Sequence, residues 1–261
     1  MQTVNVLIVG NGANVALFKQ SKFLNKLYVT SENEIKGTLR IMFNTFAELA
    51  EKCKALQIDL VIVEEEKWVL QGISDVLRKN HINCFSASSK WTNLKLFPDF
   101  AYKILNKYEI LTPPIIKLPV EYPVILKTRG IIKKANSMQD VINIKSEIYN
   151  TSPDLAQNIF LEKYLHGEKH KVISLFDKKT LVTFPQKFFP EKSVNEYTEK
   201  LKKMLINENA DFVGFINSEL LEENGMLYNT GFSFEFIPPD IDKDIIFILL
   251  SAVYQKLNEI S

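Results

Sequence analysis

The distribution of apolar residues along the chain predicts alternating strands and helices. Val4–Val9 and Ile58–Val63 are almost uninterrupted apolar runs, which are typical of strands buried on both faces of a parallel sheet. Between them, Thr45 and Glu48 have the spacing of a capping box at the start of an amphipathic helix. This β-α-β order predicts a parallel sheet with helices on both sides.

Two further helices are predicted before a domain boundary. One runs from about Val69 to Lys79 through Gly72, and a long amphipathic helix runs from about Leu94 to Tyr108, with a short strand at Asn83–Phe85 between them. Pro113-Pro114 cannot continue a helix, so we place the boundary there. The expected domains are residues 1–111 and 112–261, with a small lobe at about 120–160 in the second.

The second half of the chain changes from helix-rich to hairpin-rich. A strand ending at Lys127 is followed by another from Ile131, and Ser137 has the spacing to cap a helix reaching about Tyr149, before a loop at 152–154. The remaining expected elements are a strand at 159–165, a hairpin of 170–176 with 181–184, a helix at 194–207, a hairpin at 212–236 that turns at Glu223-Asn224-Gly225, and a helix at 245–257.

Composition excludes several classes of protein. Hydrophobic residues make up 46% and charged residues 24%, so the chain can fold around a core, and a net charge of +1 offers no basic surface for nucleic acid. No apolar run approaches the ~20 residues of a membrane span. The start of the chain has no secretory pattern, and Cys53 and Cys84 lie in apolar surroundings. We therefore expect a cytoplasmic protein that does not bind membranes.

Two stretches carry candidate binding chemistry. Gly10-Asn11-Gly12 lies between a strand and a helix, where free amides can hold a phosphate, although a turn of this kind also serves tight packing. In Ile159–Glu168, the backbone near Glu162, Tyr164 and Leu165 can pair with the edge of an adenine, and Glu168 can accept hydrogen bonds from ribose hydroxyls. An ordinary core strand with a glycine turn is the alternative for the second stretch.

The order of these segments resembles the phosphoribosylamine–glycine ligase family of the ATP-grasp superfamily. The resemblance runs from about Val4 to about Asp240 and covers Val6–Gly12, Tyr122–Lys127, the stretch up to Glu168, and Val213–Leu220 with Gly225. It implies an α/β fold in which an N-terminal Rossmann-like (pre-ATP-grasp) domain is followed by ATP-grasp α+β lobes. It also implies that the family's C-terminal domain is absent here.

The resemblance assigns roles to individual residues. Lys127 matches a lysine that meets the nucleotide, and Glu162, Tyr164, Leu165 and Glu168 complete the adenosine side. Glu66, with Gly10, Asn11 and Gly12, matches the part that holds the ribonucleotide substrate, including its phosphate. Glu219 matches the first of the carboxylates that hold Mg²⁺ against ATP, so the implied cofactors are ATP and Mg²⁺.

The chain also departs from the family pattern. Pro98 stands where the family has a first nucleotide lysine, and the glycine-rich loop after Lys127 is reduced to Thr128-Arg129-Gly130. Gly231 and Ser233 stand at positions where the family has metal-site residues. Glu64-Glu65 replaces a Gly-Pro pair before Glu66, which brings three like charges together where a phosphorylated substrate would approach. These departures predict impaired or lost ligase chemistry.

Three hypotheses follow for function. The first is a purine-biosynthesis ligase of the phosphoribosylamine–glycine type, with its chemistry impaired and at most nucleotide binding retained. The second is an active ATP-dependent carboxylate–amine ligase for another small carboxylate, with Asp240 or Asp242 joining Glu219 at the metal. The third is a catalytically silent module that binds a protein partner.

Overall fold

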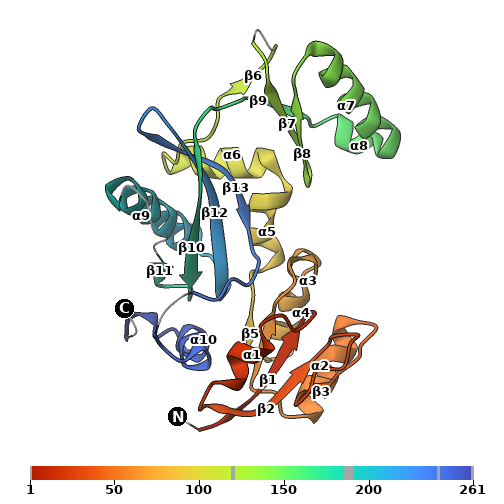
Figure 1. The fold of residues 1–261 in the computed structure, drawn as a ribbon, viewed down its shortest axis with the longest axis vertical. Helices are drawn as coiled ribbons and strands as arrows, with labels where there is room; N and C mark the ends of the chain where they lie inside the picture. The colour runs from red at the N-terminus through yellow and green to blue at the C-terminus, as the bar shows by residue number, and fades with distance from the viewer. Residues whose placement is uncertain (1, 119–120, 185–190, 240–241, 260–261) are drawn as a thin grey trace.

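The computed structural model describes residues 2–118, 121–184, 191–239 and 242–259, and it places three sheets one above another (Figure 1). A five-stranded sheet has the order β3-β2-β1-β4-β5, a four-stranded sheet the order β11-β10-β12-β13, and a second four-stranded sheet the order β6-β9-β7-β8. The predicted fold class, a Rossmann-like domain followed by ATP-grasp α+β lobes, is confirmed by this arrangement.

The five-stranded N-terminal sheet is parallel and covered on both faces. Its elements are β1 (Val4–Val9), α1 (Val15–Lys19), β2 (Leu24–Val29), β3 (Leu39–Arg40), α2 (Phe46–Ala55), β4 (Leu60–Val63), α3 (Glu66–Leu70), α4 (Ile73–Lys79) and β5 (Cys84–Phe85). Leu7 of β1 packs in one core cluster with Leu49 of α2 and Leu77 of α4, whereas Ile8 packs in another with Phe18 of α1. Burial on both faces of the sheet thus explains why residues 6–9 of β1 are all apolar.

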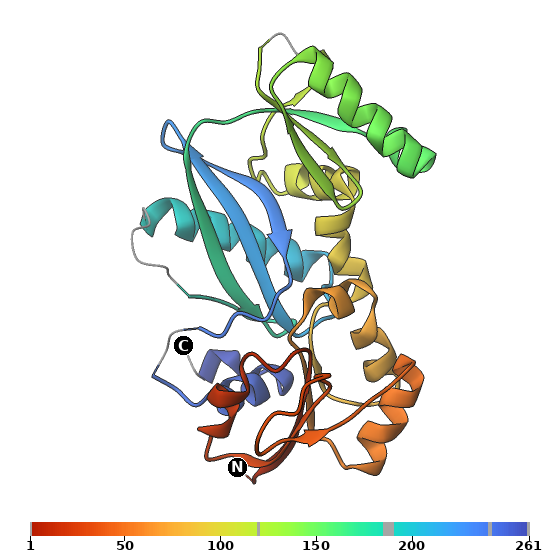
Figure 2. The same ribbon diagram turned by 45° about the vertical axis from the view of Figure 1, so that its right-hand side comes forward.

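The central sheet is antiparallel and carries the largest hairpin. Its elements are β10 (Glu168–Phe176), β11 (Leu181–Phe184), β12 (Gly214–Glu223) and β13 (Met226–Ser233). Helix α9 (Glu191–Asn207) packs on one face through residues such as Leu201 and Met204. Two helices, α5 (Ser89–Leu96) and α6 (Pro98–Lys107), lead from the N-terminal sheet toward the small sheet (Figure 2).

The small sheet is antiparallel and has its own core. Its elements are β6 (Ile115–Ile116), β7 (Val124–Thr128), β8 (Ile131–Ala135), α7 (Met138–Thr151), α8 (Pro153–Ala156) and β9 (Phe160–Lys163). Val124, Leu126 and Leu161 pack against Val141 of α7. Figure 1 shows this sheet standing beyond the end of the central sheet.

Three sequence predictions about helices are wrong. Gly72 has φ +80° and separates α3 from α4, where one helix was expected. Phe97 is extended and Pro98 begins a new helix, so the expected long helix at 94–108 is two helices. Residues 153–156 form the short helix α8 rather than a loop, with Pro153 in its first turn.

The last helix returns to the beginning of the chain. Helix α10 (Ile245–Val253) packs on α1 and β5, and Ile246 and Leu249 share a core cluster with Ile8 and Phe18. Helix α10 therefore packs against the N-terminal sheet. The division into two domains at residues 111/112 stays a prediction. Neither Cys53 nor Cys84, both buried, forms a disulfide. Within the described ranges, no helix has the length and apolar character needed to cross a membrane.

Candidate functional site

Two cavities meet at Lys127, between the small sheet and the central sheet. The larger, about 390 Å³, is lined by residues including Glu162, Tyr164, Leu165 and Lys169, and we call it the Leu165 cavity. The smaller, about 150 Å³, lies toward α5 and α6 and is lined by residues including Lys95, Pro98, Tyr102 and Gly231. Both cavities are also lined by Lys127, Ile132, Glu219 and Thr230.

Lys127 connects the two sheets that form the site. Its ammonium lies 2.8 Å from Glu162 Oε1 and donates a 2.6 Å hydrogen bond to the carbonyl oxygen of Thr230 in β13. The side chains of Lys127 and Glu162 are only 12% and 2% exposed. The antiparallel pairing of β7 with β9 explains this contact, since Ile125 lies opposite Glu162 and Lys127 opposite Phe160. The site therefore contains a buried lysine–glutamate pair, of which Lys127 lines both cavities and Glu162 lines the Leu165 cavity.

Burial changes the proton affinity of both partners. It raises the pKa of Glu162 to about 8 and lowers the pKa of Lys127 to about 8, because each charged form loses hydration. The carboxylate of Glu219 acts on Lys127 in the opposite direction and favours its charged form. A bound anionic ligand would add to this effect of Glu219, so the lysine is suited to meet a phosphate.

The shifted pKa of Glu162 predicts a pH-dependent stability. Between 4.5, the ordinary pKa of this group, and about 8, the folded state holds a proton that the unfolded state releases, so stability falls as pH rises. Urea denaturation at pH 5 and pH 8 should show that the wild type loses more stability than Glu162→Gln, by at most a few kcal/mol. Equal losses in the two proteins would contradict the raised pKa.

The other residues predicted for the adenosine side divide into two groups. Tyr164 and Leu165 line the Leu165 cavity and follow Lys163, the last paired residue of β9, so their backbone lies beyond the strand ladder. Glu168 is exposed and does not line the cavity, because Gly167 and Lys169 do so and neighbouring strand residues point to opposite faces. A contact between Glu168 and a ribose stays a prediction.

Glu219 has no second carboxylate opposite it. In the register of the central sheet it pairs with Lys171 on β10 and with Gly231 on β13. A Cβ atom at Gly231 would lie 3.2 Å from Glu219 Oε2, so the position expected for a second ligand does face Glu219. Among the described residues, no group of three His, Cys, Asp or Glu side chains could hold a metal ion. Asp240 lies outside the described residues. At the position expected for the metal, the described residues therefore supply one carboxylate, that of Glu219.

The predicted phosphate turn is filled by a side chain of the same protein. The backbone N–H groups of Gly12 and Asn14 donate to the two carboxylate oxygens of Glu64, at 2.8 and 2.7 Å. The N–H of Ala13, at 3.2 Å, and the side-chain amide of Asn14, at 2.6 Å, donate to the same group. Sequence reasoning missed this role of Glu64, although β1 and β4 are neighbours and the residues after them meet at one sheet edge.

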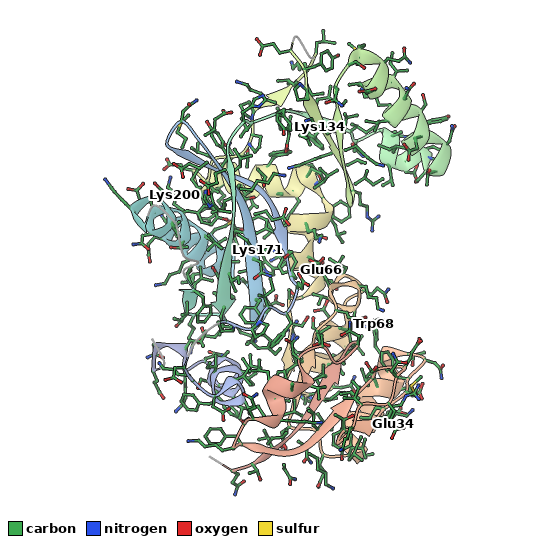
Figure 3. All side chains as sticks on the ribbon, viewed as in Figure 1. Glu34, Glu66, Trp68, Lys134, Lys171 and Lys200 are labelled. Carbon is green, nitrogen blue, oxygen red and sulfur yellow. The ribbon has the colours of Figure 1, made fainter. Side chains whose placement is uncertain are left out.

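Glu66 is also occupied by contacts within the protein. One oxygen accepts a 2.7 Å hydrogen bond from the N–H of Phe234, and the other lies against the ammonium of Lys95. Figure 3 shows Glu66 at the junction of the N-terminal part and the central sheet. Lys95 lines the smaller cavity, and its positive charge is already balanced by the carboxylate of Glu66. Substrate binding by Glu66 stays a prediction.

Comparison with known proteins supports the sequence resemblance. Residues 4–95 match the family "Phosphoribosylglycinamide synthetase, N domain". Over 209 residues the chain is 28% identical to the phosphoribosylamine–glycine ligase of Caldanaerobacter subterraneus subsp. tengcongensis, covering 69% of this chain and 49% of that protein. The same enzyme of Fusobacterium nucleatum is 22% identical and aligns with 98% of this chain and 75% of its own length. The chain thus spans about half the length of one curated relative and three quarters of the other.

A solved structure shows the same fold. The phosphoribosylamine–glycine ligase of Thermotoga maritima superimposes with a TM-score of 0.74 at 14% identity, covering 97% of this chain and 76% of that one. The chain therefore has the fold of that ligase, with a Rossmann-like sheet followed by two antiparallel sheets that meet at a buried lysine. In sequence, the chain is similar to phosphoribosylamine–glycine ligases, and its first 95 residues are similar to the N domain of that family.

Proposed function

We propose that this protein is an ATP-grasp protein of the phosphoribosylamine–glycine ligase type that retains nucleotide binding and has impaired or lost ligase chemistry. The observation that carries nucleotide binding is the Leu165 cavity, which Lys127 joins to the central sheet. The backbone of Tyr164 and Leu165 would meet the adenine edge, and Lys127 would meet phosphate. The proposed setting is the cytoplasm, with a small nucleotide rather than nucleic acid as partner.

The loss of ligase chemistry is supported by the other side of the site. Glu219 faces Gly231 instead of a second carboxylate, so the pair of carboxylates that the resemblance implies for Mg²⁺ is reduced to one. The turn at Thr128-Arg129-Gly130 connects β7 directly to β8, which leaves no chain for a loop over the phosphates. There are two alternatives: an active ligase for another carboxylate, and a catalytically silent module that binds a protein partner. Measurements of ATP binding distinguish them from the proposed function.

The proposal predicts that Lys127→Ala abolishes the thermal shift that ATP gives to the wild type. Removing the ammonium takes away the buried lysine of the cavity and its link to Thr230, so the ammonium would no longer offset the repulsion between phosphate and the carboxylate of Glu219. The measurement is the melting temperature with and without ATP, in the presence and absence of Mg²⁺. Lys26→Ala, which removes an exposed lysine of β2, is the control and should keep the shift.

The same measurement distinguishes the alternatives. An undiminished shift in Lys127→Ala would move the nucleotide to another site. A shift that requires Mg²⁺ would favour an active ligase with a metal site rebuilt around Glu219. No shift in the wild type at millimolar ATP would exclude the nucleotide-binding proposal and leave the protein-interaction module.

A further inference from the structure

The occupied turn at Gly10–Asn14 has the chemistry of a phosphate site. Consecutive backbone N–H groups that converge on one point bind anions, and phosphate is a common ligand of such turns. Here the anion is the carboxylate of Glu64, which receives four hydrogen bonds from three consecutive residues and is 7% exposed. The side chain of Ile35 also packs against this turn, because a Cβ added at Gly12 would lie 2.3 Å from Ile35 Cδ1.

We propose that Glu64 is an internal anion that takes the place of a substrate phosphate and thereby determines specificity. A phosphate group cannot enter the turn unless the carboxylate leaves, and the two anions repel each other. Glu64 would have to give up all four hydrogen bonds, each worth more than a neutral one because the acceptor is charged. The N-terminal domain therefore selects against phosphorylated ligands.

A cavity of about 410 Å³ lies beside this turn and shows what class of ligand remains. Gly10 and Asn11 form one wall, and Glu32, Glu65 and Trp68 are among the other lining residues. Glu65 is paired with Lys67 at 2.6 Å, so its charge is balanced, while Glu32 adds a carboxylate. Resting on the function proposed above, the ligand of this cavity carries no phosphate at the turn, because the carboxylate of Glu64 already holds the amides there.

The test compares Glu64→Ala with the wild type and with Glu51→Ala, which removes an exposed carboxylate of α2, as the control. Isothermal titration with inorganic phosphate and with ribose 5-phosphate should give no saturable binding to the wild type or to the control. In Glu64→Ala the amides are free, so both ligands should bind saturably. Their affinity should be at least about tenfold above the detection limit that applies to the wild type. Phosphate should also raise the melting temperature of Glu64→Ala without raising that of the wild type.

Several results would overturn the proposal. Saturable binding of ribose 5-phosphate to the wild type would do so, as would a folded Glu64→Ala variant without a gain in phosphate binding. Should Glu64→Ala fail to fold, Glu64→Gln keeps the side-chain volume but removes the charge, and a phosphate affinity equal to the wild type would then count against the proposal. ATP binding, measured on the same proteins, reports separately on the function proposed above.

Discussion

Gly167→Ala is expected to destabilise the protein by about 3 kcal/mol or more, the largest effect of a single methyl group that we predict. A Cβ at this position would lie 1.9 Å from the carbonyl oxygen of Glu222 and 2.7 Å from Leu221 Cδ2. The carbonyl is backbone and is fixed by the pairing of Glu168 with Glu222, so the turn between β9 and β10 would have to leave the central sheet. Urea denaturation monitored by circular dichroism measures the loss.

Gly225→Ala is the matched control for this prediction. Gly225 has φ +76° but nothing lies within 4 Å of the added Cβ, so only the cost of the left-handed backbone applies, about 1 kcal/mol. The two variants therefore separate close approach from backbone conformation. A loss in Gly167→Ala no larger than that in Gly225→Ala would show that the turn can move away from Glu222 at little cost.

Local sequence signals predicted the elements whose cause is local. Thr45 and Ser137 accept hydrogen bonds from the N–H groups of Glu48 and Asp140, as their capping spacing indicated. The turn at Asn224-Gly225 has positive φ at both residues and joins β12 to β13 in the expected hairpin. In each case two residues a few positions apart contain the whole signal, so no knowledge of the fold was needed.

Elements that depend on distant contacts were predicted less well. Strands β2 and β3 were missed, since β3 has only two residues, both exposed, and β2 begins with partly exposed and polar residues. Apolar periodicity continues across Gly72 and across Phe97-Pro98, and it therefore joined helices that the backbone separates. Periodicity reports which side faces the core and says little about where a helix bends.

The candidate site shows the same division. The contact of Lys127 with Glu162 follows from strand order, and both residues were identified from their segments. The orientation of Glu168 was not predicted, because it depends on which face of the strand lines the cavity. The filling of the Gly10–Asn14 turn by Glu64 was not predicted either, because it depends on which neighbour occupies the space. A motif places a residue near a site, but the partner that satisfies that residue is set by the packed structure.

The second large effect is on catalysis: we expect the purified protein not to form glycinamide ribonucleotide above background. Glu219 lies opposite Gly231, and Pro98, which stands where the resemblance implies a lysine, lines the smaller cavity. Each lost charge contact in such a site typically lowers the rate by about 10²–10³, so two losses leave on the order of 10⁻⁴ of the rate or less. The assay is phosphate release from ATP with glycine and phosphoribosylamine, and Glu219→Gln serves as the control. Turnover of order one per second that disappears in this control would falsify the inactive interpretation.

Restoring the missing carboxylate tests the cause of that loss. Gly231 faces Glu219 across the strand pair, and the nearest atom to an added Cβ is the flexible end of Glu219, which can rotate away. Gly231→Glu should therefore make ATP binding dependent on Mg²⁺ and strengthen it at least about tenfold at millimolar Mg²⁺, since two carboxylates can then share the ion. Gly231→Gln, of the same size without the charge, should show no Mg²⁺ dependence. If both variants respond equally to Mg²⁺, the metal binds elsewhere, and the absent carboxylate at position 231 is not what separates this protein from an active ligase.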